Sequence, residues 1–443
     1  MPPRFGTDGV RGEAHVELTT GFVHALGRAA ARVLGTADAF LTARDTRESG
    51  PALEAAFAAG LATEGAMVTS CGVLPTPGLA GLAADRGAPG AMVSASHNPW
   101  RDNGVKVFAR GGLKVSDEQQ AAIEVELEAL LAAGTVDVVG PTPEPAPDAA
   151  DDYVARLVRS LDGRRLEGLS VVVDCGHGAA YEVAPRALRD LGAEVLVLNA
   201  APDGRNINDG CGSTDPSALA RAVVARGADA GLALDGDADR IVMVDARGAI
   251  VDGDEILAVL ALDLAARGAL AGPAIATTVM ANLGLRRALA GHGIDVVETP
   301  VGDRAVRAAM DERGLVLGGE QSGHIILGTL ATTGDGTLTG IAVLDVVART
   351  GRSLADLAGV VVKAPQVLRN VRVADRAALD GAAGFWAEVA AVEAELGTEG
   401  RVLVRPSGTE PVVRVMVEAL APGAADAAAD RLVAALSAAL GTA

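Results

Sequence analysis

The chain contains few aromatic residues and few cysteines. Aromatics make up 2% of its 443 residues, so base stacking on aromatic side chains is not expected, and the core must come from Val, Leu, Ile and Ala. The three cysteines, Cys71, Cys175 and Cys211, are odd in number and far apart. This pattern fits neither a disulfide framework nor a CxxC metal site, so we expect a reducing, cytoplasmic location.

Positive charge and long apolar runs are also scarce. The 38 Lys+Arg against 57 Asp+Glu give a net charge of −19, which opposes binding to nucleic acid or to an anionic membrane. The most apolar stretch, residues 256–270, is interrupted by Asp263 and Arg267 before it reaches the length of a bilayer span. No apolar signal core follows the first residue. We predict no nucleic-acid partner, no membrane segment and no export. The few lysines are Lys106, Lys114 and Lys363.

Short apolar runs alternate with Ala/Leu-rich segments of helical spacing, which predicts an α/β architecture. The expected strands are 39–42, 91–94, 171–174, 231–235, 274–278 and 315–318. The expected helices are 22–34, 51–63, 181–191, 283–290 and 304–313.

Changes in composition suggest four domains. Residues 141–152 are dense in proline and acid, cannot continue a sheet or helix, and predict a linker or an exposed connection. A hairpin followed by a helix start marks a second boundary near residue 250, and from about Ala364 the pattern becomes that of a small α+β domain. We therefore expect domains at 1–150, 151–250, 251–364 and 365–443.

The segment LALDGDADR places three aspartates at alternate positions after an apolar strand: Asp235, Asp237 and Asp239. Their carboxylates repel one another unless a cation lies between them, and oxygen ligands without His or Cys suit Mg²⁺. A solvated acidic turn is one alternative. An EF-hand fails because Arg240 stands where that loop needs glycine. A DxDxT phosphatase is disfavoured because Asp239 stands in place of the threonine.

The segment AMVSASHNPWRDNGVKVF presents Ser96 and His97 on a loop after a strand, a suitable place for a nucleophile. Adjacent side chains on an extended loop point apart and no G-x-S-x-G elbow is present, so a phosphate-carrying Ser96 is favoured over a hydrolase triad. One Mg²⁺ held by the aspartates could bridge that phosphate. Lys106 lies in an apolar strand, where burying an ammonium is costly. We predict that it transfers protons or stabilises charge; the alternative is a solvated edge-strand lysine.

Two further loops carry polar groups. GGEQSGH contains Glu320, Ser322 and His324 on a glycine-flanked loop, which suits sugar hydroxyls, and His324 could relay a proton. RVLVRPSGTEPVVRV brings together the donors of a phosphate clamp: Arg405, Ser407, Gly408, Thr409 and Arg414. An ordinary turn around Pro406 would explain the proline but not both arginines. The N-terminal GTDGVRG, with Arg11, predicts a weaker anion-binding loop.

Five strings, GTDGVRG, SASHNP, DGDADR, GEQSGH and RPSGTEP, occur in order along the whole chain. Together they resemble those of the α-D-phosphohexomutase superfamily, most closely its bacterial phosphoglucosamine mutase branch. The resemblance implies four domains around a central cleft, three of related mixed α/β build and a last one similar to the TATA-binding-protein fold. It implies a small-molecule sugar phosphate as partner: glucosamine 6-phosphate, converted to glucosamine 1-phosphate through a phosphoserine and a glucosamine 1,6-bisphosphate intermediate. A phosphomannomutase/phosphoglucomutase and a non-catalytic sugar-phosphate sensor are the alternatives, and a homodimer is left open.

The resemblance also implies residue roles. Ser96 would be the phosphoserine and, with Asp235, Asp237 and Asp239, a ligand of one Mg²⁺ per chain. Lys106 and His324 match candidate proton-transfer groups. The implied substrate contacts are Glu320, Ser322, Arg405, Ser407, Gly408, Thr409 and Arg414. Arg11, beside the phosphoserine, is a further implied catalytic residue. The implied supporting residues are His97, Arg240, Asp303 and Arg304. In the loop 299–306, Pro300 and Ala305 depart from the basic and aromatic residues that many members carry there.

Overall fold

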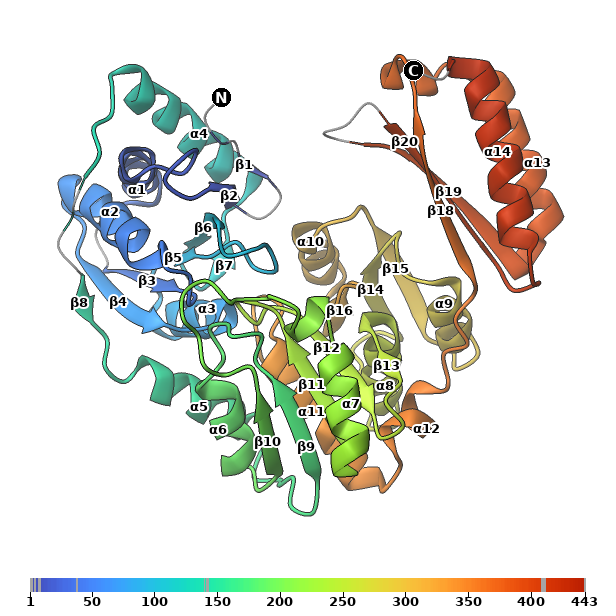
Figure 1. The fold of residues 1–443 in the computed structure, drawn as a ribbon, viewed down its shortest axis with the longest axis horizontal. Helices are drawn as coiled ribbons and strands as arrows, with labels where there is room; N and C mark the ends of the chain where they lie inside the picture. Colours follow the sequence, from blue (N-terminus) through green and yellow to red (C-terminus); the bar gives the residue numbers. More distant parts are fainter. Residues whose placement is uncertain are drawn as a thin grey trace. The chain divides into compact units, whose positions relative to one another are not determined.

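The computed structural model describes residues 3, 5–6, 9–36, 39–138, 140, 143–407 and 412–441. The architecture is α/β with four domains, and each domain has a sheet of its own (Figure 1). By compactness the chain forms two units, one of Met1–Thr278 with Ile294–Val360 and one of Val279–Gly293 with Val361–Ala443. Among the described residues, none of the helices combines the length and the apolar character that a membrane span needs.

The first sheet has eight strands in the order β1-β2-β6-β5-β3-β4-β8, with β7 paired to β6. The strands are β1 Phe5–Gly6, β2 Gly9–Glu13, β3 Phe40–Arg44, β4 Val68–Val73, β5 Gly90–Val93, β6 Asp102–Ala109, β7 Leu113–Lys114 and β8 Glu144–Pro145. The helices are α1 Thr20–Leu34, α2 Gly50–Thr63, α3 Thr76–Arg86 and α4 Asp117–Ala132. Strands β3 and β5 are parallel, and β6 returns antiparallel to β5. The turn between β5 and β6 therefore lies at the carboxyl end of a buried parallel strand.

The second and third sheets repeat this arrangement. The second has the order β10-β9-β11-β12-β13 and the third β15-β14-β16-β17. The second comprises β9 Ser170–Asp174, β10 Glu194–Leu198, β11 Ala230–Leu234, β12 Ile241–Asp245, β13 Ile250–Val251, α5 Ala149–Arg159, α6 Val183–Asp190 and α7 Ser217–Arg226. The third comprises α8 Gly253–Ala266, β14 Ala274–Thr278, β15 Asp295–Thr299, α10 Asp303–Arg313, β16 Leu317–Gly319, β17 Ile325–Leu327, α11 Gly336–Thr350 and α12 Leu354–Ala358. In each sheet a parallel strand turns into an antiparallel partner, β11 into β12 and β16 into β17. The loops 235–240 and 320–324 are these turns.

The second unit contains a three-stranded antiparallel sheet, ordered β18-β20-β19. Its elements are α9 Leu283–Ala290, β18 Gln366–Arg372, α13 Ala383–Leu396, β19 Gly400–Pro406, β20 Val412–Ala419 and α14 Ala424–Leu440. Helices α13 and α14 pack together against the sheet (Figure 1). The buried Glu418 accepts hydrogen bonds from Asn282 Nδ2 at 3.1 Å and from the Leu283 N–H at 2.9 Å. Helix α9 therefore packs with this unit, although the sequence suggested that it belongs to the preceding domain.

Most expected elements lie where the sequence placed them, and 274–278 and 283–290 coincide with β14 and α9. The linker predicted over 141–152 is wrong in part. Residues 144–145 form β8, parallel to β4, and α5 begins at Ala149, so the boundary expected at residue 150 falls inside that helix. Strand β8 is tolerated because it lies at the edge of the sheet, where the missing N–H of Pro145 costs no ladder hydrogen bond.

Candidate active site

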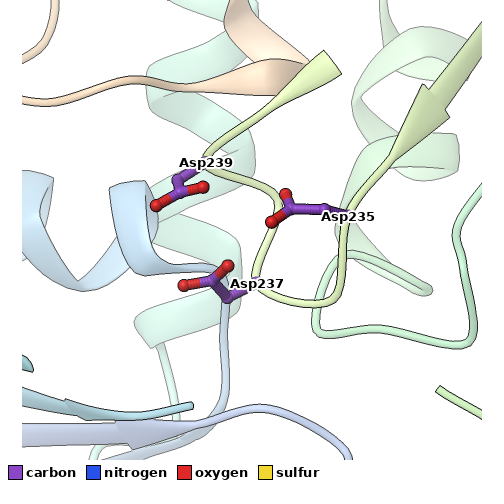
Figure 2. A group of neighbouring side chains, drawn as sticks. All are labelled: Asp235, Asp237 and Asp239. Atoms are coloured by element: carbon purple, nitrogen blue, oxygen red, sulfur yellow. The ribbon is translucent and has the colours of Figure 1, made fainter. Parts of the chain in front are cut away.

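Three buried aspartates converge on the turn between β11 and β12. Asp235, Asp237 and Asp239 each offer a carboxylate oxygen, and these oxygens lie within 4.8 Å of one another (Figure 2). The turn closes because the Ala238 N–H donates to the Asp235 carbonyl at 3.0 Å and Ala238 adopts a φ of 55°. Asp235 Oδ1 also accepts the Arg240 N–H at 3.1 Å. The turn therefore directs the three aspartate carboxylates toward one point.

Ser96 meets this turn from a distant part of the chain. Its Oγ donates to Asp235 Oδ2 at 2.6 Å across a separation of 139 residues. The backbone of Ser96 is held at a φ of 54°, with its N–H bonded to Ser94 Oγ at 2.9 Å. Its carbonyl accepts from Asn208 Nδ2 at 2.9 Å and from Arg47 Nη2 at 3.1 Å. The expected nucleophile and the expected metal loop therefore share one site.

His97 lies closer to Ser96 than the sequence suggested. We expected adjacent side chains to point apart, but His97 Nδ1 lies 3.2 Å from Ser96 Oγ. The prediction is wrong because the left-handed backbone of Ser96 bends a segment that we had taken as extended. Burial lowers the pKa of His97, and so do the nearby cations Arg240 and Arg11. The neutral imidazole is therefore favoured beside the hydroxyl.

Lys106 is buried among the carboxylates. It lies in β6, which runs between β2 and β5, so the edge-strand alternative is wrong. Its Nζ donates to Asp237 Oδ2 at 2.7 Å and to Asp239 Oδ2 at 2.9 Å. Asp237 Oδ2 accepts a further hydrogen bond from Thr76 Oγ1 at 2.5 Å. One ammonium thus offsets part of the negative charge of the aspartates.

The remaining oxygens fit a divalent metal. Asp237 Oδ1 and Asp239 Oδ1 are buried and find no hydrogen-bond donor in the part of the chain that the structure describes. Burial and repulsion from the other two carboxylates raise the pKa of Asp235 well above its usual value. Burial acts in the same direction on Asp239, but Lys106 and His324 hold its pKa well below the usual value. A cation that prefers oxygen ligands would satisfy both of these oxygens, which lack a hydrogen-bond donor within the described ranges.

His324 joins the turn between β16 and β17 to the metal loop. Its ring is buried, Nε2 accepts the Gly334 N–H at 3.0 Å, and Nδ1 lies 3.8 Å from Asp239 Oδ2. This acceptor role places the ring proton of the neutral imidazole on Nδ1, facing Asp239. Burial alone would lower the pKa of His324, but Asp239 and Asp303 raise it above the usual value. Protonation of Nε2 would break the hydrogen bond from Gly334, so that bond belongs to the neutral ring.

Other residues of the turn 320–324 contact the backbone of neighbouring elements. Glu320 Oε1 accepts the Gly302 N–H at 3.2 Å, and Ser322 is exposed. Gly323 has a φ of 87°, and a Cβ there would lie 1.9 Å from the Ile241 carbonyl oxygen. Only glycine fits this approach, which fixes the position of the turn on β12.

The residues expected beside the reacting groups have different partners in the structure. Arg240 Nε is 3.9 Å from Asp239 Oδ1, and Arg11 lies in β2, paired with β6. Asp303 forms an ion pair with Lys114. The guanidinium of Arg304 instead binds α4, through Asp117 Oδ1 at 2.6 Å and Gln120 Oε1 at 2.8 Å.

The expected phosphate clamp belongs to the second unit. Arg405 and Arg414 are directly opposite each other on β19 and β20. Burial and the charge of Arg414 lower the pKa of Arg405. Ser407 is buried, and its N–H donates to the Val412 carbonyl at 2.9 Å. Two opposed guanidiniums repel each other, and an anion between them would offset that repulsion. Gly408 and Thr409 lie outside the described residues.

The sequence reasoning missed several buried groups behind Ser96. Asp45 Oδ2 accepts from Ser94 Oγ at 2.6 Å and pairs with Arg47, and burial raises the pKa of Asp45. Their position directly after β3 was a usable signal, because polar residues at the carboxyl ends of parallel strands gather at one edge. Asn208 lies in a loop with no such pattern, so no signal pointed to it.

Known proteins resemble this chain over almost its whole length. Four family models match, described as phosphoglucomutase/phosphomannomutase alpha/beta/alpha domain I (residues 2–133), domain II (151–248), domain III (252–364) and C-terminal domain (368–435). A phosphoglucosamine mutase of Kineococcus radiotolerans is 52% identical, covering 98% of both chains. One of Thermobifida fusca is 53% identical, covering 98% of this chain and 97% of its own. The crystal structure of a phosphoglucomutase/phosphomannomutase family protein from Burkholderia thailandensis superposes with a TM-score of 0.82 at 27% identity, covering 98% of this chain and 97% of the other.

Proposed function

Because the chain belongs to the phosphoglucosamine mutases of the phosphoglucomutase/phosphomannomutase family, we propose that it interconverts glucosamine 6-phosphate and glucosamine 1-phosphate through a phosphorylated Ser96. The observation that carries the proposal is the 2.6 Å hydrogen bond from Ser96 Oγ to Asp235 Oδ2. This hydrogen bond joins the Ser96 hydroxyl of the SASHNP loop to a buried acidic cluster that fits a cation.

The reaction consists of two phosphoryl transfers. In the first, the bond between phosphorus and Ser96 Oγ breaks while sugar O1 bonds to the phosphorus. The O1 proton is taken up by a base and a proton is returned to Oγ, which leaves neutral Ser96 and glucosamine 1,6-bisphosphate. This intermediate turns over in the site, and its 6-phosphate passes to Ser96 Oγ by the reverse proton movement. Glucosamine 1-phosphate is released and Ser96 is phosphorylated again.

The residues around Ser96 have different roles in these two phosphoryl transfers. The Lys106 ammonium, held between two carboxylates, offsets negative charge on the transferring phosphoryl group. His97 Nδ1, at 3.2 Å from Ser96 Oγ, is placed to exchange the serine proton. His324 Nε2 already accepts the Gly334 N–H, so His324 serves better to hold Asp239 than to accept the sugar proton in this geometry.

Mg²⁺ is the cation we assign to the acidic cluster; Asp235, Asp237 and Asp239 would hold it together with the phosphate of Ser96. When bound, it supplies positive charge beside the phosphoryl oxygens. Glu320 and Ser322 contact the sugar. Arg405, Ser407, Gly408, Thr409 and Arg414 hold the phosphate that is not reacting, as their donors suit.

The substrate test separates this proposal from a phosphomannomutase/phosphoglucomutase, which would use the same groups at Ser96. Turnover of glucosamine 6-phosphate is compared with turnover of glucose 6-phosphate and mannose 6-phosphate by kcat/KM. We expect a preference for the amino sugar. A preference for either neutral sugar would overturn the assignment.

The phosphoserine test uses intact mass. We expect the purified chain to carry one added phosphate, and Ser96→Ala to lose both that mass and all turnover. Ser217→Ala, which removes an exposed hydroxyl at the start of α7, is the control and should keep both. Turnover that survives in Ser96→Ala would exclude this mechanism, and wild-type protein without any turnover would favour a sugar-phosphate sensor.

A further inference from the structure

Lys114 forms an ion pair across two domains of the first unit. It ends the short strand β7, which pairs with β6 of the first sheet. Its Nζ contacts Asp303 Oδ2 at the first residue of α10, which belongs to the third domain. The two side chains are only 15% and 12% exposed. This pair is therefore largely withdrawn from water, unlike most of the ion pairs on the surface.

Two further sets of contacts join the third domain to the first, one of them at the start of α10. Arg304 donates to Asp117 Oδ1 at 2.6 Å and to Gln120 Oε1 at 2.8 Å. Thr332 Oγ1 donates to the Gly112 carbonyl at 2.7 Å. The contact between β7 and α10 themselves is the Lys114–Asp303 ion pair. The first domain thus fixes one end of a helix in the third.

That end of α10 reaches the sugar-recognition turn. The N–H of Gly302, one residue before α10, donates to Glu320 Oε1 at 3.2 Å. Asp303 Oδ2, the atom that Lys114 contacts, lies 3.5 Å from His324 Nε2. A displacement of the first turn of α10 would therefore move the partner of Glu320 and the charge that faces His324.

We propose that Lys114 is a positioning residue for sugar binding: its pairing with Asp303 fixes the first turn of α10 and, through the Gly302 N–H, the carboxylate of Glu320. The inference rests on the proposed function. Exposed ion pairs contribute little, but removing one partner of a buried pair leaves an uncompensated charge, and the surrounding backbone must relax to solvate it. Here the group that loses its cation would be Asp303, directly beside Gly302; it would keep only the Arg304 N–H at 2.8 Å from Oδ1 and His324 Nε2 at 3.5 Å from Oδ2.

The test measures KM and kcat separately in the variant Lys114→Met and compares each with wild type. We expect KM for glucosamine 6-phosphate to rise about tenfold or more, the usual effect of losing a residue that orients a ligand-binding group, with kcat within about threefold of wild type. Lys114→Arg keeps the charge and should recover most of the loss. Arg159→Met removes a positive charge from the exposed end of α5 and should leave KM unchanged. The phosphate on Ser96, followed by intact mass, should be the same in every variant.

A double-mutant cycle with Asp303→Asn distinguishes positioning from direct contact with substrate. If Lys114 acts through Asp303, both single variants and the double variant raise KM by a similar factor. Additive increases would mean that Lys114 contacts the substrate itself, and would overturn the inference. So would a wild-type KM in Lys114→Met, or a fall in kcat with KM unchanged. If Lys114→Met does not fold, Asp303→Asn alone decides, and a wild-type KM there refutes the inference. These outcomes leave the proposed function standing, whereas an inactive wild type would remove both.

Discussion

Asp237→Asn is the substitution that most directly probes the acidic cluster. Asp237 Oδ2 accepts hydrogen bonds from Thr76 Oγ1 and Lys106 Nζ, while Oδ1 is buried without a donor among the described residues. Asparagine has nearly the same shape and keeps one oxygen. The substitution therefore removes one negative charge with little change in packing.

The magnitude follows from that lost charge. Two unit charges about 4 Å apart interact by about 4 kcal/mol at an effective dielectric constant of about 20. Lys106 keeps its second partner, Asp239 Oδ2 at 2.9 Å, so its ammonium remains in place and repels a bound cation more than before. The attraction between Lys106 and the remaining carboxylates offsets part of this loss in cation-binding energy. We expect a net loss of about 2–4 kcal/mol in cation binding, which is about 30- to 700-fold in affinity.

The assay is turnover of glucosamine 6-phosphate across a magnesium titration, with direct titration of Mn²⁺ as a binding measurement that does not depend on activity. The apparent metal affinity should fall by the stated factor in both experiments, and saturating metal should restore part of kcat. Asp229→Asn is the matched control, because Asp229 is an exposed aspartate just before β11, the strand that leads to Asp235. Metal titrations of Asp237→Asn that superimpose on those of wild type would refute the reasoning.

Three further predictions concern other parts of the molecule. Gly323→Ala would place a Cβ 1.9 Å from the Ile241 carbonyl oxygen at a φ of 87°; we expect a lower thermal midpoint and a higher KM, and unchanged values would contradict the packing argument. Burial raises the pKa of Asp335 from 3.8 to about 6, so between these values the folded chain holds more protons than the unfolded chain and stability falls as pH rises. Asp335→Asn should flatten that slope in thermal midpoints measured from pH 4 to pH 6, and parallel slopes would exclude this account. Arg405→Gln relieves the repulsion from Arg414, so calorimetry should show a gain of about 0.2–1 kcal/mol in the second unit while KM rises; a loss of stability would count against an anion site.

The sequence alone predicted those features that depend on interactions between residues close together in the chain. Strand β14 and helix α9 match their expected ranges because apolar periodicity and chain breakers act over a few residues. The acidic cluster was predictable for the same reason: three carboxylates at alternate positions repel one another wherever the turn folds. The five strings also sufficed to indicate the family that the comparisons support.

Local reasoning failed where the backbone departed from its expected path. No residue type in the sequence predicts that a serine adopts a left-handed backbone conformation. The φ of 54° at Ser96 nevertheless brings His97 Nδ1 to 3.2 Å from the Ser96 hydroxyl. The acidic, proline-rich stretch suggested a linker, but Pro145 is accommodated in β8 because that strand lies at the edge of the sheet.

What the sequence by itself determined was the chemical inventory: a serine on a loop, three aspartates that need a cation, and a lysine too costly to leave buried alone. The tertiary structure decided which of these groups meet. Ser96 reaches Asp235 across 139 residues, and Lys106 lies between Asp237 and Asp239. Those contacts depend on which strands pair and on how the sheets pack within the first unit. Such choices are made by burial summed over the whole core, and no short stretch of sequence encodes them.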